Sequence, residues 1–128
     1  AIVWVESRGG PWALNVNIGK SGWPIRPASE PEARRWIAWL LARGHNVDLG
    51  LMQINSRHLG RLRLSAERLL DPCVNLRAGA RLLNELIARH GETWRAIMRY
   101  NGSNPAYARR VQAAWAAFRR IERAEGRR

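Results

Sequence analysis

The chain has 128 residues, of which 46% are hydrophobic and seven are tryptophan, enough for one domain with a single core. Its net charge is +12, and Lys20 is the only lysine among 22 basic residues. This sign of charge favours an acidic partner such as nucleic acid, anionic lipid or an anionic polymer. No apolar run approaches the roughly 18 residues of a membrane span, and the first residues lack the basic region and cleavage site of a signal peptide.

The first 26 residues predict the end of a helix followed by a small hairpin. Residues 1–7 are expected to be the last turns of a helix, because Gly9-Gly10-Pro11 would end it. Residues 12–18 alternate between apolar residues and small or polar ones, which indicates a short strand. A turn over residues 19–22 and a second short strand over residues 23–26 complete the hairpin. Pro24 predicts that this strand lies at an edge.

Helical patterns dominate the rest of the chain. Ser29-Glu30-Pro31-Glu32 is a capping-box pattern, and Arg43-Gly44 would end the helix that it starts. Residues 45–56 are expected to be irregular at first and then a short helix, and a loop with a short helix follows over residues 57–70. Asp71-Pro72 predicts a long helix that stops at Gly91, and a short helix follows over residues 93–98. Asn104-Pro105 begins the last helix. We therefore expect a mainly α fold with five or six helices, one small β-hairpin and a single domain over residues 1–128.

Helical spacing also predicts which side chains form the core. The apolar face of the long helix comprises Leu76, Ala80, Leu83, Leu86 and Ile87. That of the last helix comprises Tyr107, Val111, Trp115, Phe118 and Ile121, with Arg109, Arg119, Arg120 and Arg123 grouped opposite. Trp36, Trp39 and Trp115 are expected in the core, whereas Trp12 and Trp23 flank the hairpin and are weaker candidates for stacking on sugar faces.

Cysteine and histidine give little sign of metal or redox chemistry. Cys73 is the only cysteine, so it forms no internal disulfide. It is interpreted either as a small buried hydrophobe or as half of a disulfide whose partner lay in a missing N-terminal segment. His45, His58 and His90 lack metal-ligand spacing and are expected at the surface. We expect no metal and no cofactor.

Glu6 is the first candidate for chemistry. Its carboxylate ends an apolar run, where apolar surroundings raise a carboxyl pKa towards the range of a general acid. Ser7 is placed to help fix the carboxyl group by a hydrogen bond. The alternative is that Glu6 is a solvated residue closing a helix. Gln53 and Asn55 place amides among apolar residues, and buried amides need partners from either the protein or a polar ligand.

Three segments stand in a characteristic order: Glu6-Ser7, the stretch Gly-Leu-Met-Gln-Ile-Asn-Ser at residues 50–56, and Tyr100-Asn101-Gly102 with Tyr107 further on. This set resembles the lytic transglycosylases of bacterial cell walls, above all the small enzymes of type IV secretion, conjugation and type III secretion systems. Residues 13–17, 47–50 and 71–76 also look like that subgroup. Members of the family usually have more chain, often with a cysteine, before the catalytic glutamate, whereas five residues precede Glu6 here.

The resemblance implies a fold, a reaction and a location. The fold would be a goose-type lysozyme-like helical domain. The reaction would cleave the β-1,4 bond between N-acetylmuramic acid and N-acetylglucosamine in peptidoglycan, with closure of a 1,6-anhydro ring. The protein would be a monomer of the periplasm or cell envelope, recruited in some cases by secretion or conjugation machinery. Neither nucleic acid nor a membrane span would be involved.

The resemblance also implies roles for individual residues. Glu6 would be the single catalytic acid and base, and Gln53 and Asn55 would contact N-acetyl and hydroxyl groups of the sugars. Met52 would line the cleft, Tyr100 would hydrogen-bond near the Glu6 carboxyl, and Asn101 would support that loop. Ser7 and Tyr107 complete the predicted substrate-binding set. A second carboxylate is unnecessary, because the substrate itself supplies the attacking hydroxyl group.

Two other functions remain open on sequence grounds. Asp48 is interpreted as a turn or cap residue ahead of Gly50; if it instead faced Glu6 across a water molecule, the protein would be a lysozyme-type hydrolase. The arginine face of the last helix would also suit a basic module that binds nucleic acid. That function leaves Glu6, Gln53 and Asn55 unexplained.

Overall fold

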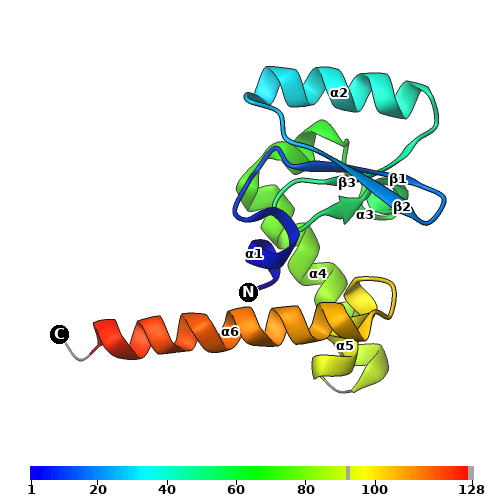
Figure 1. Ribbon diagram of the computed structural model, residues 1–128. Helices are drawn as coiled ribbons and strands as arrows, with labels where there is room; N and C mark the ends of the chain where they lie inside the picture. The colour runs from blue at the N-terminus through cyan, green and yellow to red at the C-terminus, as the bar shows by residue number, and fades with distance from the viewer. Residues whose placement is uncertain (92, 127–128) are drawn as a thin grey trace. The chain divides into compact units, whose positions relative to one another are not determined.

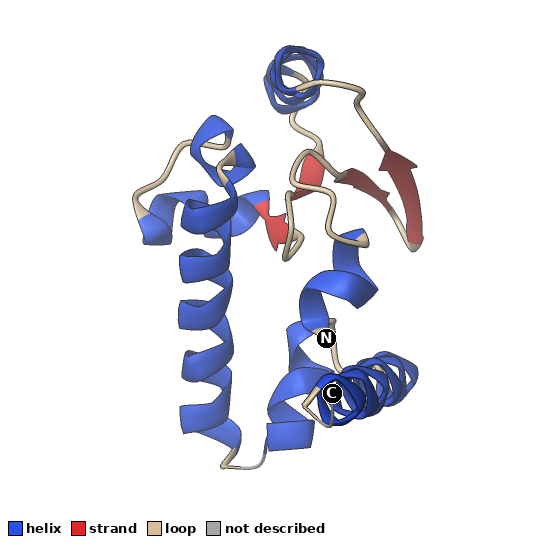
Figure 2. Ribbon diagram, turned by 90° about the vertical axis from the view of Figure 1, so that its left-hand side faces the viewer, coloured by secondary structure: helices blue, strands red, loops and turns tan. Residues whose placement is uncertain are grey.

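The computed structural model describes residues 1–91 and 93–126 (Figure 1). In chain order, its elements are α1 (Ile2–Ser7), β1 (Leu14–Ile18), β2 (Ser21–Ile25), α2 (Glu30–Ala42), β3 (Asn46–Leu49), β4 (Ile54–Asn55), the 3-10 helix η1 (Ser56–His58), α3 (Leu59–Leu62), the 3-10 helix η2 (Glu67–Leu70), α4 (Pro72–His90), α5 (Thr93–Tyr100) and α6 (Pro105–Glu125). Helices predominate and the strands are few and short (Figure 2), which confirms the predicted mainly α, lysozyme-like class.

Backbone contacts group the chain into two compact units. The sheet unit is Glu6–Gly79, and the terminal unit combines Ala1–Val5 with the chain from Ala80 onward. The boundaries fall inside α1 and inside α4. The expected single catalytic domain over residues 1–128 stays a prediction.

The sheet unit contains one antiparallel sheet with strand order β2-β1-β3-β4. The predicted hairpin is confirmed as β1 and β2, and Pro24 lies in an edge strand as expected. The predicted irregular segment and short helix over residues 45–56 are wrong. Asn46–Leu49 pairs with β1, and Ile54–Asn55 pairs with β3 across a turn at residues 50–53.

The sheet has one apolar face and one amide face. Strand alternation and register place these buried residues on the apolar face: Leu14, Val16, Val47, Leu49 and Ile54. α2 packs on this side and buries Ala33, Ile37 and Leu40 (Figures 1 and 2). Its capping box is confirmed, because the Ser29 hydroxyl accepts from the Glu32 amide at 3.3 Å. The Glu32 carboxylate in turn accepts from the Ala28 amide at 2.8 Å.

The long helix α4 begins where expected but buries a different face. Asp71 caps it by accepting from the Val74 amide at 3.0 Å. Leu76 is 41% exposed and Ala80 is also exposed, so these two members of the predicted core are wrong. The residues that α4 does bury are Asn75, Ala78, Gly79 and Leu82. The buried face of α4 contains a polar Asn75 and a Gly79, so the spacing of apolar residues alone indicates the wrong face.

The terminal unit has its own small core around Ile97, Tyr107 and Val111. Ile2, Val5 and Leu83 pack against this cluster. The predicted apolar stripe of α6 is covered only in its first half. Its later members are exposed rather than buried, at 53%, 38% and 53%: Trp115, Phe118 and Ile121. Within this unit Phe118 meets Trp4 edge to face, with ring centroids 6.5 Å apart.

Two further expectations about burial are corrected. Cys73 is exposed in the first turn of α4, so it is not a small buried hydrophobe. Trp36 and Trp39 are 37% and 48% exposed, so they are not core residues. No helix in the described part of the chain is both long and apolar enough to cross a membrane.

Candidate active site

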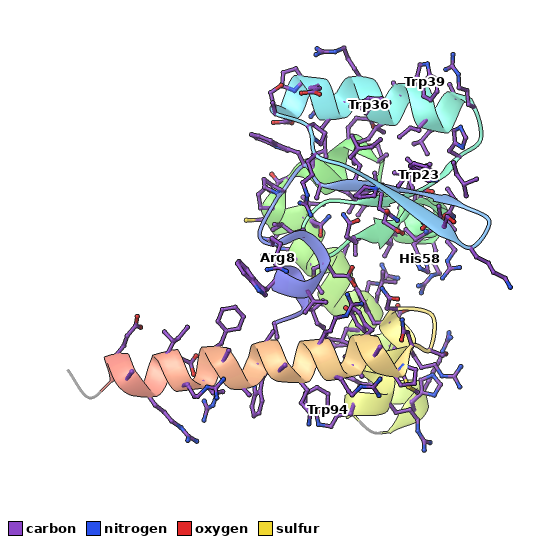
Figure 3. The ribbon with its side chains drawn as sticks, viewed as in Figure 1. Arg8, Trp23, Trp36, Trp39, His58 and Trp94 are labelled. Carbon is purple, nitrogen blue, oxygen red and sulfur yellow. The ribbon has the colours of Figure 1, made fainter. Side chains whose placement is uncertain are left out.

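Glu6 lies in the last turn of α1, where its residue is half-buried. The chain reverses immediately afterwards through positive φ angles at Arg8 (56°) and Gly9 (81°). The Ser7 residue is buried, and its carbonyl accepts from the Gly10 amide at 3.0 Å and from Arg26 Nη1 at 3.4 Å. These bonds anchor the backbone beside Glu6. Figure 3 labels Arg8 at this bend.

The turn between β3 and β4 is built on a glycine that no other residue would replace easily. Gly50 has a φ of 72°, and its amide donates to the Ala13 carbonyl at 2.8 Å. A Cβ atom here would overlap the amide nitrogen of Asn75 and lie 2.6 Å from the Leu69 carbonyl oxygen. Both the backbone angle and the close approach therefore require glycine.

Gln53 is held in this turn through its amide nitrogen. Its Nε2 donates to the Ala13 and Gly50 carbonyls, each at 2.9 Å, while its own φ is 49°. The side chain is half-buried, and both of its N–H groups have partners. No residue that the structure describes donates to its Oε1. The amide oxygen is therefore the atom that remains for a ligand.

Asn75 of α4 bonds to the backbone of the same turn. This residue was not identified from the sequence. The residue is fully buried in α4. Its Nδ2 donates to the Leu49 carbonyl at 2.8 Å and to the Leu69 carbonyl at 2.9 Å, and its Oδ1 accepts from the Met52 amide at 2.8 Å. A single Asn at a buried helical position was the available signal. Such a residue must find hydrogen-bond partners.

The amide face of the sheet carries a network of five polar side chains from three strands: Asn15, Asn17, Asn46, Asp48 and Asn55. Asn55 donates to Asn46 Oδ1 at 2.6 Å and to Asp48 Oδ1 at 2.8 Å. Its own Oδ1 accepts from Asn46 at 2.9 Å and from the Arg57 amide at 3.0 Å. The Asn55 amide is thus already bonded within the protein, and its predicted contact with sugar stays a prediction.

Asp48 is the hub of this network. Its Oδ2 accepts from Asn15 at 3.1 Å and from Asn17 at 2.9 Å, and its Oδ1 accepts from Asn55. Asp48 lies within β3, so its interpretation as a turn or cap residue is wrong. Three amide N–H groups hold the carboxylate, so it acts as a structural acceptor that joins β1, β3 and β4.

The remaining predicted site residues are placed as follows. Met52 is buried, and its Sδ lies against the backbone of Gly79 in α4. Tyr107 is 1% exposed in the core of the terminal unit, and the half-buried Tyr100 packs against that core. Asn101 is exposed, and its carbonyl accepts from the Asn104 amide at 3.2 Å. The proximity of Tyr100, Asn101 and Tyr107 to Glu6 stays a prediction, because these three residues belong to the terminal unit and Glu6 to the sheet unit.

No metal-binding cluster is found in the described part of the chain. No three His, Cys, Asp or Glu side chains there come together as a metal would require.

The three histidines are half-buried rather than exposed. Trp12 is half-buried and lines a hollow of the sheet unit together with Pro11 and Leu70.

Comparison with known proteins identifies the family. Residues 1–118 match the family described as the transglycosylase SLT domain. The chain is 37% identical over 97 residues to invasion protein IagB of Salmonella typhimurium, covering 63% of this chain and 59% of that protein. It is 34% identical over 128 residues to protein virB1 of Agrobacterium fabrum, covering 89% of this chain and 51% of that protein.

The type IV secretion system protein virB1 of Brucella abortus is 35% identical over 89 residues, covering 70% of this chain and 37% of that protein. The chain thus spans little more than half the length of the first curated relatives that it matches. No solved structure matches it. The match over residues 1–118, with the Glu6 segment and the turn at residues 50–53 inside it, shows that the chain belongs to the transglycosylase SLT domain family.

Proposed function

We propose that the protein is a peptidoglycan lytic transglycosylase that uses Glu6 as its only catalytic carboxylate. The observation that carries the proposal is a half-buried glutamate at the anchored end of α1, in a chain of the transglycosylase SLT domain family. The sugar bond cleaved is the β-1,4 bond between N-acetylmuramic acid and N-acetylglucosamine.

Glu6 acts twice in the proposed reaction. Its protonated carboxyl group first gives a proton to the glycosidic oxygen, so that the N-acetylglucosamine side leaves as an alcohol. The resulting carboxylate then takes the proton of the muramoyl C6 hydroxyl group while that oxygen bonds to the anomeric carbon. A 1,6-anhydro ring closes, and Glu6 regains the proton that it gave. The nucleophile is part of the bound substrate, so proximity replaces a second catalytic group.

Gln53 is the group best prepared to bind the sugar. Both N–H groups of its amide are held by backbone carbonyls, so the Oε1 atom has a fixed orientation. An amide oxygen accepts hydrogen bonds, and the acetamido N–H of either sugar is a matching donor. A fixed acceptor loses little conformational entropy when the sugar binds.

The hydrogen bonding of Asp48 favours the lyase over the hydrolase. An inverting hydrolase needs a second carboxylate that activates a water molecule, and a retaining one needs a carboxylate that attacks the sugar. Both Asp48 oxygens instead accept amide N–H groups within the sheet. To act as a base or nucleophile, the carboxylate would have to give up bonds that join three strands.

The proposed place of action is the cell envelope, where peptidoglycan lies. One relative bears the name of a type IV secretion system protein and another that of an invasion protein. We propose by analogy that a secretion or conjugation apparatus recruits this protein in order to open the wall locally.

Digestion of purified sacculi tests the reaction. The parent protein should release muropeptides that end in 1,6-anhydromuramic acid, as identified by mass spectrometry. Glu6→Gln should lower the rate of release by at least about 10²-fold, since it removes the proton donor and acceptor. Glu67→Gln, another half-buried glutamate of the sheet unit, is the matched control and should digest like the parent.

Other products would contradict the proposal in distinct ways. If all released muropeptides carried reducing ends and none carried 1,6-anhydromuramic acid, the reaction would be hydrolysis, which needs a second carboxylate. Unchanged release by Glu6→Gln would remove Glu6 from the mechanism.

A further inference from the structure

One side of α2 presents aromatic rings that remain partly exposed. Trp36 and Trp39 are 37% and 48% exposed, and their rings meet edge to face with centroids 6.2 Å apart. His45 stacks on Trp39 at 6.3 Å with an angle of 15° between the ring planes. Exposed aromatic side chains that lie side by side are typical of a binding surface.

Arg43 fixes a positive charge on the same surface. Its guanidinium lies 4.0 Å from the centre of the Trp39 ring, and its Nη1 donates to the Trp39 carbonyl at 3.1 Å. The cation is therefore held at the aromatic face and is not a freely moving surface charge. The ring and the charge are already in place before any ligand arrives.

Trp23 extends the surface onto the sheet. It is 61% exposed in the edge strand β2. It pairs with Val16, whose side chain is buried on the apolar face, so its indole lies on the side of the sheet that α2 covers. Figure 3 shows the labelled Trp23 between its strand and α2. We call Trp23, Trp36, Trp39 and His45 the aromatic ridge.

We propose that the aromatic ridge is a second binding surface for peptidoglycan glycan strands, additional to the site predicted at Glu6. The apolar C–H face of a sugar ring can pack against an exposed indole ring. Arg43 supplies a partner for the carboxylates of muramic acid and of the stem peptides. The identity of this polymer rests on the proposed function, but binding to the ridge does not require that the bond be cleaved.

The size of the ridge favours a narrow polymer over a protein. A tryptophan side chain offers up to about 250 Å², so the exposed parts of the three indoles give at most about 370 Å². A stable protein interface buries about 800 Å² on each partner. Pro24 also removes a backbone donor from the edge strand, which weakens strand addition by a protein partner.

Binding assays in the Glu6→Gln background separate this surface from catalysis. The variant protein is pelleted with insoluble sacculi and with insoluble chitin, a glycan without carboxylates. Trp36→Ala/Trp39→Ala should weaken binding to both by about tenfold or more, equivalent to about 1.4 kcal/mol. Arg43→Gln should weaken binding to sacculi and leave binding to chitin unchanged. The double variant in the otherwise unmodified chain should still cleave short soluble glycans at the parent rate.

Trp115→Ala is the matched control. Trp115 is 53% exposed with the Arg119 guanidinium 5.9 Å from its ring centre, but it lies in the terminal unit outside the ridge. It should bind both carriers like the parent. Trp36→Phe/Trp39→Phe retains the rings and should bind more tightly than the alanine pair, which guards against a general loss of fold.

Unchanged binding by the alanine pair would overturn the proposal. So would an equal loss in Trp115→Ala. If the alanine pair bound sacculi normally but lost self-association in analytical ultracentrifugation, the ridge would join copies of the chain and the proposal would fail. Failure of the proposed function would show itself differently, as an absence of anhydro-muropeptides from parent digests.

Discussion

At the scale of single residues, Asp48 shows how a polar side chain can specify strand pairing. Its carboxylate accepts N–H groups from Asn15 and Asn17 of β1 and from Asn55 of β4. Gly22 completes the arrangement, because a Cβ there would lie 2.9 Å from the Asn15 amide oxygen. A one-residue slip of β3 would carry Asp48 to the apolar face, so this network reinforces the observed register.

Asp48→Asn should therefore destabilise the fold by about 1–3 kcal/mol. An asparagine offers one acceptor oxygen in place of two and no charge, so at least one amide donor would face another N–H group. Urea denaturation measures the free energy of unfolding. Glu30→Gln is the matched acid-to-amide control, because Glu30 pairs with Arg34 at 2.9 Å on an exposed helix turn.

That control should change the free energy of unfolding by no more than about 0.5 kcal/mol. An Asp48→Asn effect as small as the control would mean that the amide network adds nothing to stability.

At the scale of elements, β3 shows where sequence reasoning stopped short. Residues 46–49 alternate between polar and apolar residues with the period of a strand, but Asn and Asp are poor strand formers and favoured an irregular interpretation. Cross-strand hydrogen bonds satisfy these side chains, and no single segment reveals such bonds. The caps of α2, α4 and α6 were predictable because each depends on neighbouring residues alone.

The face that a helix buries was also harder to predict than the helix itself. The apolar residues of α2 include both the buried Ile37 and the exposed Trp36 and Trp39. Periodicity finds an apolar stripe but does not give the width of the surface that covers it. In α4 the buried face includes Gly79, which periodicity passes over, because its value lies in the space that it leaves for Met52.

Gly79→Ala tests this close approach between α4 and the turn after β3. Alanine normally stabilises a helix by about 1 kcal/mol relative to glycine. Here the new Cβ would overlap the Met52 sulfur, so a net loss of about 1 kcal/mol or more is expected, since overpacking costs about 1–3 kcal/mol. Gly60→Ala in α3 is the control, because a Cβ there meets nothing within 4 Å and should not destabilise the protein.

A double-mutant cycle identifies the cause. In a Met52→Ala background the overlap with the sulfur is gone and only the Cβ of residue 52 remains close, at 3.0 Å, so Gly79→Ala should become much less destabilising in urea denaturation. A gain in stability from Gly79→Ala in the parent would show that the helix and turn separate easily.

At the scale of the whole molecule, the order of the three segments indicated the family, which the match over residues 1–118 confirms. The anionic partner that the charge of +12 indicates stays a prediction. The sequence did not show that the two groups of predicted site residues belong to different compact units, with Glu6 and Gln53 in one and Tyr100 and Tyr107 in the other. The unit boundaries fall inside the helices α1 and α4, so no linker-like segment of Gly, Pro or Ser marks them in the sequence.

The charge makes a prediction about binding to whole sacculi. Arginines of α6 are exposed at positions 109, 119, 120 and 123, far in sequence from the aromatic ridge. Sacculi carry carboxylates along their whole length, so long-range attraction should add to binding by the ridge. The range of such attraction shrinks from about 30 Å at 0.01 M salt to about 3 Å at 1 M. Binding of the Glu6→Gln protein to sacculi should therefore fall steeply across this range, as measured by pelleting.

Chitin provides the contrast, because it lacks carboxylates. Stacking of sugars on indoles is not screened by salt, so binding to chitin should stay level or rise slightly over the same range. At high salt the two carriers should then give similar affinities, both sensitive to Trp36→Ala/Trp39→Ala. If binding to sacculi were as insensitive to salt as binding to chitin, the net charge of +12 would have no part in holding the protein on the wall.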